Sequence, residues 1–297
     1  MAKAVLTTKA SPSYDDLPET RYHFPSTYLG PLRAAIGDHI VYYEPRRSSI
    51  EDASRGGRQA YFATARIDGI VEDDVRPGHH YALISNYLDF DRPVPFSEEG
   101  EYYESALQKA DGSTNRGAFG RAVRAIPEIE FDSILKAGFA AELQPSADND
   151  PRTSFDEPIV EYERPIVELT ISRPFRDLSF KRVVRTAYDN KCAFTGLRLI
   201  NGGGRPEVQA AHIMPVTSKG PDSIRNGLAL SGTVHWMFDR GLISIDDDYR
   251  IIAANDGVPE QFRSLFSRTG KLIVPNEPHL RPHPHYLRFH RQNIFKG

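Results

Sequence analysis

Residues 209–242 read QAAHIMPVTSKGPDSIRNGLALSGTVHWMFDRGL, and this stretch decides the fold of the C-terminal half of the chain. A strand-like run ends at His212, and a second apolar run, NGLAL, begins at Asn226. The segment HWMFDRG that follows has the composition of a short helix. The sequence therefore predicts the order strand, strand, helix.

Four polar residues of this stretch are candidates for one site. Asn226 lies fourteen residues after His212, His235 nine after that, and Asp239 four further. Residues four apart share a helix face, so His235 and Asp239 can direct a nitrogen and an oxygen at one ion. Such mixed donors suit a catalytic divalent cation, Mg²⁺ or Mn²⁺. The alternative is that each residue is structural, a packed histidine or an aspartate that caps a turn.

The same residues suit hydrolysis of a phosphodiester bond, which needs an activated water and a cation to stabilise developing charge. A histidine side chain has an ordinary pKa of about 6.5, so its neutral form can accept a proton at cellular pH. We expect His212 to be this general base. We expect Asn226 to hold the loop between strand and helix through side-chain hydrogen bonds.

The segments AHIMP (211–215), NGLAL (226–230) and HWMFDRGL (235–242) resemble the HNH, or ββα-metal, nuclease family. The resemblance extends from about Phe175 to Phe295. It implies that His212 is the general base, that Asn226 is structural, and that His235 and Asp239 bind one catalytic metal ion.

The sequence departs from the family pattern in two places. Many members carry a further metal ligand just before the catalytic histidine, where this chain has Ala211. Gln209 or Glu207 could compensate, directly or through water. Many members also hold a structural zinc ion with paired CxxC motifs, whereas Cys192 is the single cysteine here. We therefore expect no structural zinc, and one cysteine also suits a cytoplasmic protein.

Charge is distributed unevenly along the chain. Residues 165–297 contain 19 Lys and Arg against 12 Asp and Glu, a net charge of +7, whereas the first 164 residues hold 18 against 28, or −10. A basic half suits phosphate binding, although the charge could also belong to an ordinary solvated surface. Residues 175–191 are expected to form a helix whose basic side includes Arg182 and Arg185, both candidates for DNA phosphate contacts.

Composition also gives the domain boundaries. We expect a flexible arm at 1–20, a first domain at 21–143, a polar, acidic linker at 144–165 and the nuclease domain at 166–297. No apolar run approaches the roughly 18 residues that a membrane span needs, and the N-terminus lacks the apolar stretch of a secretory signal. We expect no membrane association.

The first domain alternates β-rich runs with turn clusters. The runs GDHIVYYEPRR (37–47) and YFATARIDGI (61–70) resemble PUA-like barrels, which include the EVE and SRA modules. This resemblance implies a reader that draws a modified cytosine into an aromatic pocket. Candidate pocket residues are Tyr42, Tyr43, Tyr61, Phe62, Tyr87 and Phe90, and candidate phosphate contacts are Arg46 and Arg47. The alternatives are barrel core for the aromatics and solvated loop charges for the arginines.

Together these features predict an α+β protein with an N-terminal PUA-like β-barrel, flanking helices and a C-terminal ββα-metal nuclease domain. The tail, PHLRPHPHYLRFHRQNIF, resembles HNH proteins of the restriction type, which implies host defence. The expected function is type IV-like restriction of double-stranded DNA that contains 5-methylcytosine or 5-hydroxymethylcytosine. One site cuts one strand, so a homodimer or successive nicks are expected. The alternatives are a DNA clamp without cleavage, and a nuclease whose first domain reads RNA or protein.

Overall fold

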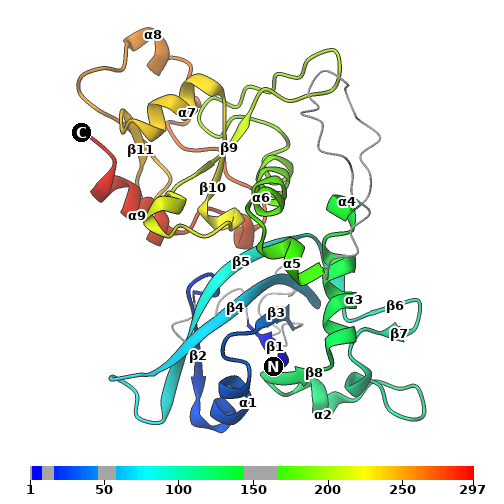
Figure 1. Cartoon of the computed structure of the whole chain (residues 1–297). Coiled ribbons are helices and arrows are strands. Elements are labelled where there is room, and N and C mark those ends of the chain that lie inside the picture. Colours follow the sequence, from blue (N-terminus) through cyan, green and yellow to red (C-terminus); the bar gives the residue numbers. More distant parts are fainter. Residues whose placement is uncertain (1, 9–16, 46–57, 144–165) are drawn as a thin grey trace. The chain divides into compact units, whose positions relative to one another are not determined.

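The structure of the chain is a computed structural model that describes residues 2–8, 17–45, 58–143 and 166–297 (Figure 1). The chain divides into two compact units, Met1–Arg176 and Asp177–Gly297. Buried apolar clusters lie within the second unit and on both faces of the sheet in the first. Because both units combine helices with strands, the chain is an α+β protein, as predicted.

A six-stranded sheet with the strand order β2-β5-β4-β3-β1-β8 forms the framework of the first unit. Its strands are β1 (Lys3–Thr7), β2 (Arg21–Pro25), β3 (His39–Glu44), β4 (Ala60–Glu72), β5 (His79–Pro95) and β8 (Val123–Ile126). β1 pairs in parallel with β3, and the other neighbouring strands are antiparallel. Three register shifts between β4 and β5 bend these long strands, because a bulge increases local twist. The sheet therefore curls into a half-barrel (Figure 1).

Alternating side chains of the sheet supply two separate cores. In β3, Tyr42 packs into the cluster with Leu6 and Phe24, whereas Tyr43 packs into the cluster with Val5 and Phe131. Successive strand residues point to opposite faces, so a run such as IVYY can be buried throughout. Both faces of this part of the sheet are therefore covered.

Short helices complete the first unit. α3 (Glu128–Gly138) buries Phe131, Ile134 and Leu135 against one face of the sheet. Pro127 occupies the position before the helix with an extended backbone, which is the usual conformation of an N-cap residue. The other elements are α1 (Leu29–Ala34), α2 (Arg116–Phe119), α4 (Ala140–Leu143), α5 (Ile166–Ile171), β6 (Ser97–Glu98), β7 (Glu101–Tyr102) and two 3₁₀ turns at Ser26–Tyr28 and Ser105–Leu107.

The prediction of a loose arm over residues 1–20 is wrong for its first part. Residues 3–7 form β1, which lies between β3 and β8. Val5 and Leu6 are fully buried on opposite faces of the sheet. The polar residues around this short apolar run hid its role, because a strand buried on both faces shows no alternation. Residues 9–16 lie outside the described residues.

The expected domain boundary also needs adjustment. The linker predicted at 144–165 lies outside the described residues. α5, which begins the predicted nuclease domain, belongs to the first unit, where Ile166 is buried in the core around α3. Phe175 also contacts Phe139, with ring centroids 5.3 Å apart. The division between the units therefore falls within α6 (Arg173–Ala187), after Arg176.

The second unit contains the predicted strand, strand, helix order. β9 (Gln209–His212) pairs antiparallel with β10 (Gly227–Leu230), and α7 (Gly232–Asp239) follows. α6 packs closely on β10, because a Cβ added at Gly227 would lie 2.4 Å from Cγ2 of Val184. The helix and the hairpin share a core that includes Phe180, Phe194, Leu228, Val234 and Phe238.

The rest of the second unit encloses this centre. β11 (Ile243–Ile245) pairs with β12 (Ile251–Ala253), and α8 (Glu260–Arg263) follows. The tail ends in α9 (Pro284–Asn293), which buries Tyr286, Leu287 and His290. Three 3₁₀ turns lie at Val216–Ser218, Ile224–Asn226 and Pro278–Leu280. In the described part of the chain, no helix is long and apolar enough to span a membrane.

Candidate active site

His212 ends β9 opposite Gly227, and two neighbours determine the orientation of its imidazole ring. Its Nε2 atom lies 2.9 Å from Oδ1 of Asp222, and the ring stacks on Phe180 with centroids 3.9 Å apart. An ionised carboxylate can only accept a hydrogen bond, so with Asp222 ionised this contact requires the proton of His212 to be on Nε2. Nδ1 therefore carries the lone pair. The His212 side chain is 18% exposed, which leaves part of the ring accessible.

Asn226 holds the loop that joins the two strands. Its Oδ1 atom accepts from the backbone N–H of Met214 at 2.8 Å, and Nδ2 donates to the carbonyls of Met214 and Pro221 at 3.0 and 2.9 Å. Asn226 is fully buried. The loop is tight around it, because a Cβ at Gly220 would lie 1.8 Å from the Met214 carbonyl oxygen. Asn226 therefore holds both ends of the loop between β9 and β10 through its side chain.

His235 and Asp239 lie one turn apart on α7, with Nε2 of the histidine 3.4 Å from Oδ2 of the aspartate. Nδ1 of His235 lies 2.9 Å from Oε1 of Gln209 in β9. An amide oxygen accepts, so Nδ1 carries the proton and the lone pair on Nε2 lies beside the carboxylate. Both side chains are partly exposed, at 23% and 56%. This pair fits a divalent ion, because it offers one nitrogen and one oxygen with room for water.

The position before His212 provides no ligand. Ala211 is buried in the core of the second unit, on the side away from solvent. Glu207 accepts a hydrogen bond from the backbone N–H of Gly232 at 2.7 Å and so binds the start of α7. Among the residues that the structure describes, no cluster of three or more His, Cys, Asp or Glu could hold a metal. Gln209 instead supports a ligand, because it contacts His235.

α6 lies beside both His212 and the pocket that contains His235. Ala210 and Gln209 line a pocket of about 800 Å³ together with His235. Lys181 and Arg185 reach this pocket from α6, one and five residues after the Phe180 that stacks on His212. α6 therefore contributes to both parts of the site.

Positive charge surrounds this pocket. Lys181, Arg185 and Arg205 line it, against the single carboxylate of Glu207. Arg182 follows Lys181 in α6 but does not line the pocket. A concave surface with this charge attracts a phosphodiester backbone.

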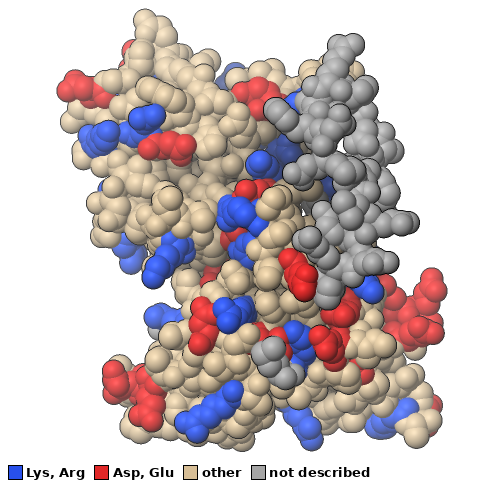
Figure 2. Space-filling model, in the orientation of Figure 1, with Lys and Arg blue, Asp and Glu red and all other residues tan. Residues whose placement is uncertain are grey.

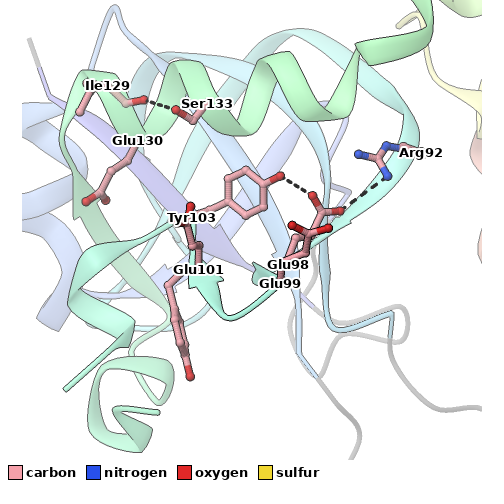
Figure 3. Close-up of a pocket in the computed structure, with 9 residues that line it drawn as sticks. Arg92, Glu98, Glu99, Glu101, Tyr103, Ile129, Glu130 and Ser133 are labelled. Carbon is pink, nitrogen blue, oxygen red and sulfur yellow. Dashed lines mark hydrogen bonds and ion pairs between the residues drawn. The ribbon is translucent and has the colours of Figure 1, made fainter. Parts of the chain in front are cut away.

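The first unit has a pocket of opposite character. Its volume is about 980 Å³, and Glu98, Glu99, Glu101 and Glu130 line it with Arg92 as the single basic residue (Figure 3). Tyr103 donates to Glu98 at 2.8 Å, and Arg92 lies 3.6 Å from the same carboxylate. Four carboxylates repel phosphates, so this pocket does not suit a nucleic-acid backbone. Basic and acidic side chains alternate over the visible face of this unit (Figure 2).

The six aromatic candidates of the first unit lie inside its cores. Tyr42, Phe62 and Tyr87 share one face of the sheet, and Tyr43, Tyr61 and Phe90 share the other. All six are buried, and Phe62 is the most exposed at 6%. The guanidinium of Arg58 lies 3.9 Å over the Phe62 ring and binds Glu44 through Nε at 2.6 Å. Arg46 and Arg47 lie outside the described residues.

Two residues with a place in this geometry were not predicted from the sequence. Asp222 lies in a glycine–proline turn that reads as an ordinary loop, and Phe180 reads as an ordinary core position of a helix. Only the folded loop brings Asp222 to His212 across ten residues of chain. A carboxylate in the loop just after a candidate base was the one available hint.

Comparison with known proteins identifies the second unit. Residues 192–246 match the family model described as HNH endonuclease, and this segment contains His212, Asn226, His235 and Asp239. Residues 192–246 therefore have the sequence of an HNH endonuclease domain, which supports a DNA-cleaving hydrolase. This agrees with the strand, strand, helix order and with the paired polar residues on α7.

No curated protein matches the chain. Among solved structures, the modification-dependent TagI restriction endonuclease aligns with 97% of this chain and 81% of its own, at 16% identity and a TM-score of 0.31. The type IV phosphorothioation-dependent restriction endonuclease ScoMcrA aligns with 98% of this chain and 50% of its own, at 12% identity and a TM-score of 0.23. TM-scores of this size do not establish a common fold, so neither alignment decides the function.

Proposed function

We propose that this chain is a modification-dependent, type IV-like restriction endonuclease. Its C-terminal part, residues 166–297, hydrolyses phosphodiester bonds in double-stranded DNA, and residues 21–143 read a modified cytosine, either 5-methyl or 5-hydroxymethyl. The observation that carries the nuclease part is the placement of His212. Its proton is held on Nε2 by Asp222, and its Nδ1 lone pair remains available to a water molecule.

In the proposed reaction, Nδ1 of His212 accepts a proton from a water molecule while the water oxygen attacks the phosphorus atom. The bond from phosphorus to the 3′ oxygen breaks, and the 3′ oxygen takes up a proton from solvent. General-base assistance of this kind contributes on the order of 10²–10⁴ in rate. Phe180 keeps the ring plane in place during the proton transfer.

His235 and Asp239 would hold the divalent ion, Mg²⁺ or Mn²⁺. Such an ion supplies charge stabilisation to the phosphate oxygens and to the leaving oxygen. Gln209 accepts a hydrogen bond from Nδ1 of His235. This contact leaves the Nε2 lone pair of His235 on the side of Asp239, where the ion would bind. Support of this kind is typical of histidine ligands in metal sites.

The basic pocket would bind the DNA backbone beside the scissile phosphate. Lys181, Arg185 and Arg205 converge on the surface that also contains His235. Phosphate contacts orient a nucleic acid without reading its sequence. Arg182, on the same helix, would contact the backbone outside the pocket. Specificity must then come from another part of the chain.

For the reader, we propose that the sheet face holding Tyr42, Phe62 and Tyr87 supplies the base-binding region, and this face must open to admit a base because all three side chains are buried. Tyr42 stacks on Phe62 with ring centroids 5.8 Å apart, and Arg58 covers Phe62 with a side chain that is 20% exposed. Aromatic rings bind a flipped base by stacking, and an arginine at the entrance could contact the phosphate next to it. The curled sheet supports a PUA-like barrel as the framework of this proposal.

The test is cleavage of matched plasmids that carry cytosine, 5-methylcytosine or 5-hydroxymethylcytosine, with Mg²⁺ or Mn²⁺. Wild type should cut modified plasmids only, and His212→Ala should cut none while retaining DNA affinity. A gel also separates nicks from double-strand breaks. Because the chain holds one such motif, a linear product should increase with protein concentration if two copies cooperate.

Each contrary result points to a different alternative. Cutting that ignores the modification would keep the nuclease and remove the modified-cytosine reader, leaving RNA or protein as the partner of the first unit. Absence of cutting with every metal, together with intact DNA binding, would identify a clamp. Cutting by His212→Ala at the wild-type rate would exclude the proposed base.

A further inference from the structure

Asp222 is a buried carboxylate that points at the candidate base. Its side chain is 1% exposed, and its Oδ1 atom lies 2.9 Å from Nε2 of a histidine that is 18% exposed. Burying a carboxylate is costly unless hydrogen bonds compensate, so such a residue requires a reason. Asp222 is therefore a buried hydrogen-bond acceptor, and the His212 ring that it contacts is partly accessible to solvent.

The loop around Asp222 is rigid on both sides. The carbonyl of Pro221 accepts from Nδ2 of Asn226 at 2.9 Å. On the other side, the Ser223 hydroxyl accepts from the backbone N–H of Arg225 at 3.2 Å and begins the 3₁₀ turn at Ile224–Asn226. Asn226 binds Met214 as well, two residues after His212. The carboxylate and the imidazole are therefore held by one hydrogen-bonded unit.

We propose that Asp222 is the positioning residue of the hydrolytic reaction, holding the proton on Nε2 of His212 so that Nδ1 accepts the proton of the attacking water. This inference rests on the proposed nuclease function. Asp222 also acts through its charge. When His212 takes up a proton, the Asp222 carboxylate lies beside the resulting imidazolium and stabilises it. Without the carboxylate, the ring could rotate or carry its proton on the wrong nitrogen.

A purely structural role makes a different prediction. If Asp222 only held the loop, its replacement would lower stability and would reduce cleavage through unfolding alone. If it positions His212, an isosteric amide should reduce the rate constant while DNA affinity and folding persist. An aspartate that orients a catalytic histidine can contribute on the order of 10⁴ in rate, as serine proteases show.

The experiment compares Asp222→Asn with wild type and with Asp256→Asn, which changes an exposed aspartate of the same unit. We expect Asp222→Asn to lower the single-turnover cleavage constant by about 10²–10⁴. Its KM and DNA dissociation constant should change less than about twofold, since the phosphate contacts remain. Asp256→Asn should match wild type in every measurement.

A second measurement does not depend on activity. Nitrogen-15 labelling of histidine lets NMR report which ring nitrogen of His212 carries the proton in the full chain, with His212→Ala used for assignment. Wild type should show the proton on Nε2, and Asp222→Asn should show loss of that single tautomer. A wild-type ring protonated on Nδ1, or unchanged cleavage by Asp222→Asn, would overturn the proposal.

These two readouts separate the inference from the function on which it rests. If wild type cuts no DNA, the proposed reaction fails whichever nitrogen of His212 carries the proton, and the Asp222 contact is then only structural. If wild type cuts DNA and Asp222→Asn cuts it at the same rate, the nuclease function stands and only the role of Asp222 fails. If Asp222→Asn fails to fold, the wild-type tautomer and the rate of Asp222→Glu decide. We expect the longer glutamate side chain of that variant to displace the ring and lower the rate without loss of DNA affinity.

Discussion

The imidazole of His212 lies flat on the ring of Phe180, with centroids 3.9 Å apart and planes inclined by 11°. Phe180 belongs to α6, and His212 ends β9, so this contact joins the helix to the hairpin. The ring plane is thus fixed by packing, and the Asp222 contact fixes the rotation within that plane. Both restraints act on one side chain.

Phe180→Leu tests the packing restraint. Leucine keeps the position apolar but removes the flat surface under His212, so we expect the cleavage rate to fall about tenfold. The free energy of unfolding should fall by about 1–2 kcal/mol, because the replacement leaves a small cavity. Rates are measured in single turnover and stability by urea denaturation. Phe266→Leu, which alters the same core at Phe194, should lower stability and leave the rate unchanged.

Removal of metal-site residues should change metal affinity in a graded manner. Asp239→Ala removes one of two ligands and should abolish detectable Mn²⁺ uptake in calorimetry. Gln209→Ala leaves both ligands but releases Nδ1 of His235, so we expect affinity to fall about 10–100-fold. Asp248→Ala, at an exposed position, is the control. Full Mn²⁺ affinity in Asp239→Ala would place the metal elsewhere.

Neutral replacements in the basic pocket should weaken DNA binding through the salt-dependent part of the affinity. Each of Lys181→Gln, Arg185→Gln and Arg205→Gln should lower the slope of log affinity against log salt concentration by about 1. Modified and plain DNA should lose affinity equally, because the contacts are to phosphates. Arg268→Gln, at an exposed position outside the pocket, should leave the slope unchanged. A loss confined to modified DNA would contradict the assignment.

Acid should destabilise the second unit through His290. Burial lowers the pKa of His290 to about 4 from its ordinary 6.5, although its contact with the Phe238 carbonyl opposes the shift. Between these two pKa values, the His290 imidazole is therefore protonated in the unfolded chain and neutral in the native state. Stability is fully present above pH 6.5 and is lost as pH falls toward 4, by about 2 kcal/mol between pH 7 and 5.

Trp236, the single tryptophan, lies in the second unit and provides a fluorescence signal for its unfolding. Denaturation curves at pH 7 and pH 5 should show that His290→Gln removes this part of the pH dependence. The comparison uses the difference between the two pH values, because the substitution also removes the stacking contact with Phe238. His285→Gln, at an exposed position of the same helix, should retain the wild-type difference. An unchanged difference in His290→Gln would contradict the assignment.

The N-terminal half was less predictable than the nuclease half. The β-rich character of residues 39–95 was evident, but the strand at residues 3–7 was not, because its few apolar residues stand among polar neighbours. Nor could sequence distinguish aromatic core from aromatic pocket. Tyr42 and Tyr43 are adjacent in sequence, and only the sheet sends them to opposite cores.

The sequence by itself determined the strand, strand, helix order at residues 209–239 and the pairing of His235 with Asp239. Both follow from local rules, since strand alternation and the helical repeat act over a few residues. The match to the HNH endonuclease family covers the same segment.

Only the tertiary structure decided which atoms meet. Asp222 reaches His212 because Asn226 folds the intervening loop, and Phe180 reaches it because Gly227 lets α6 approach β10. Gln209 reaches His235 because α7 packs beside β9. These contacts join residues 10 to 32 positions apart, where local propensity carries no information and packing of the whole unit determines the distances.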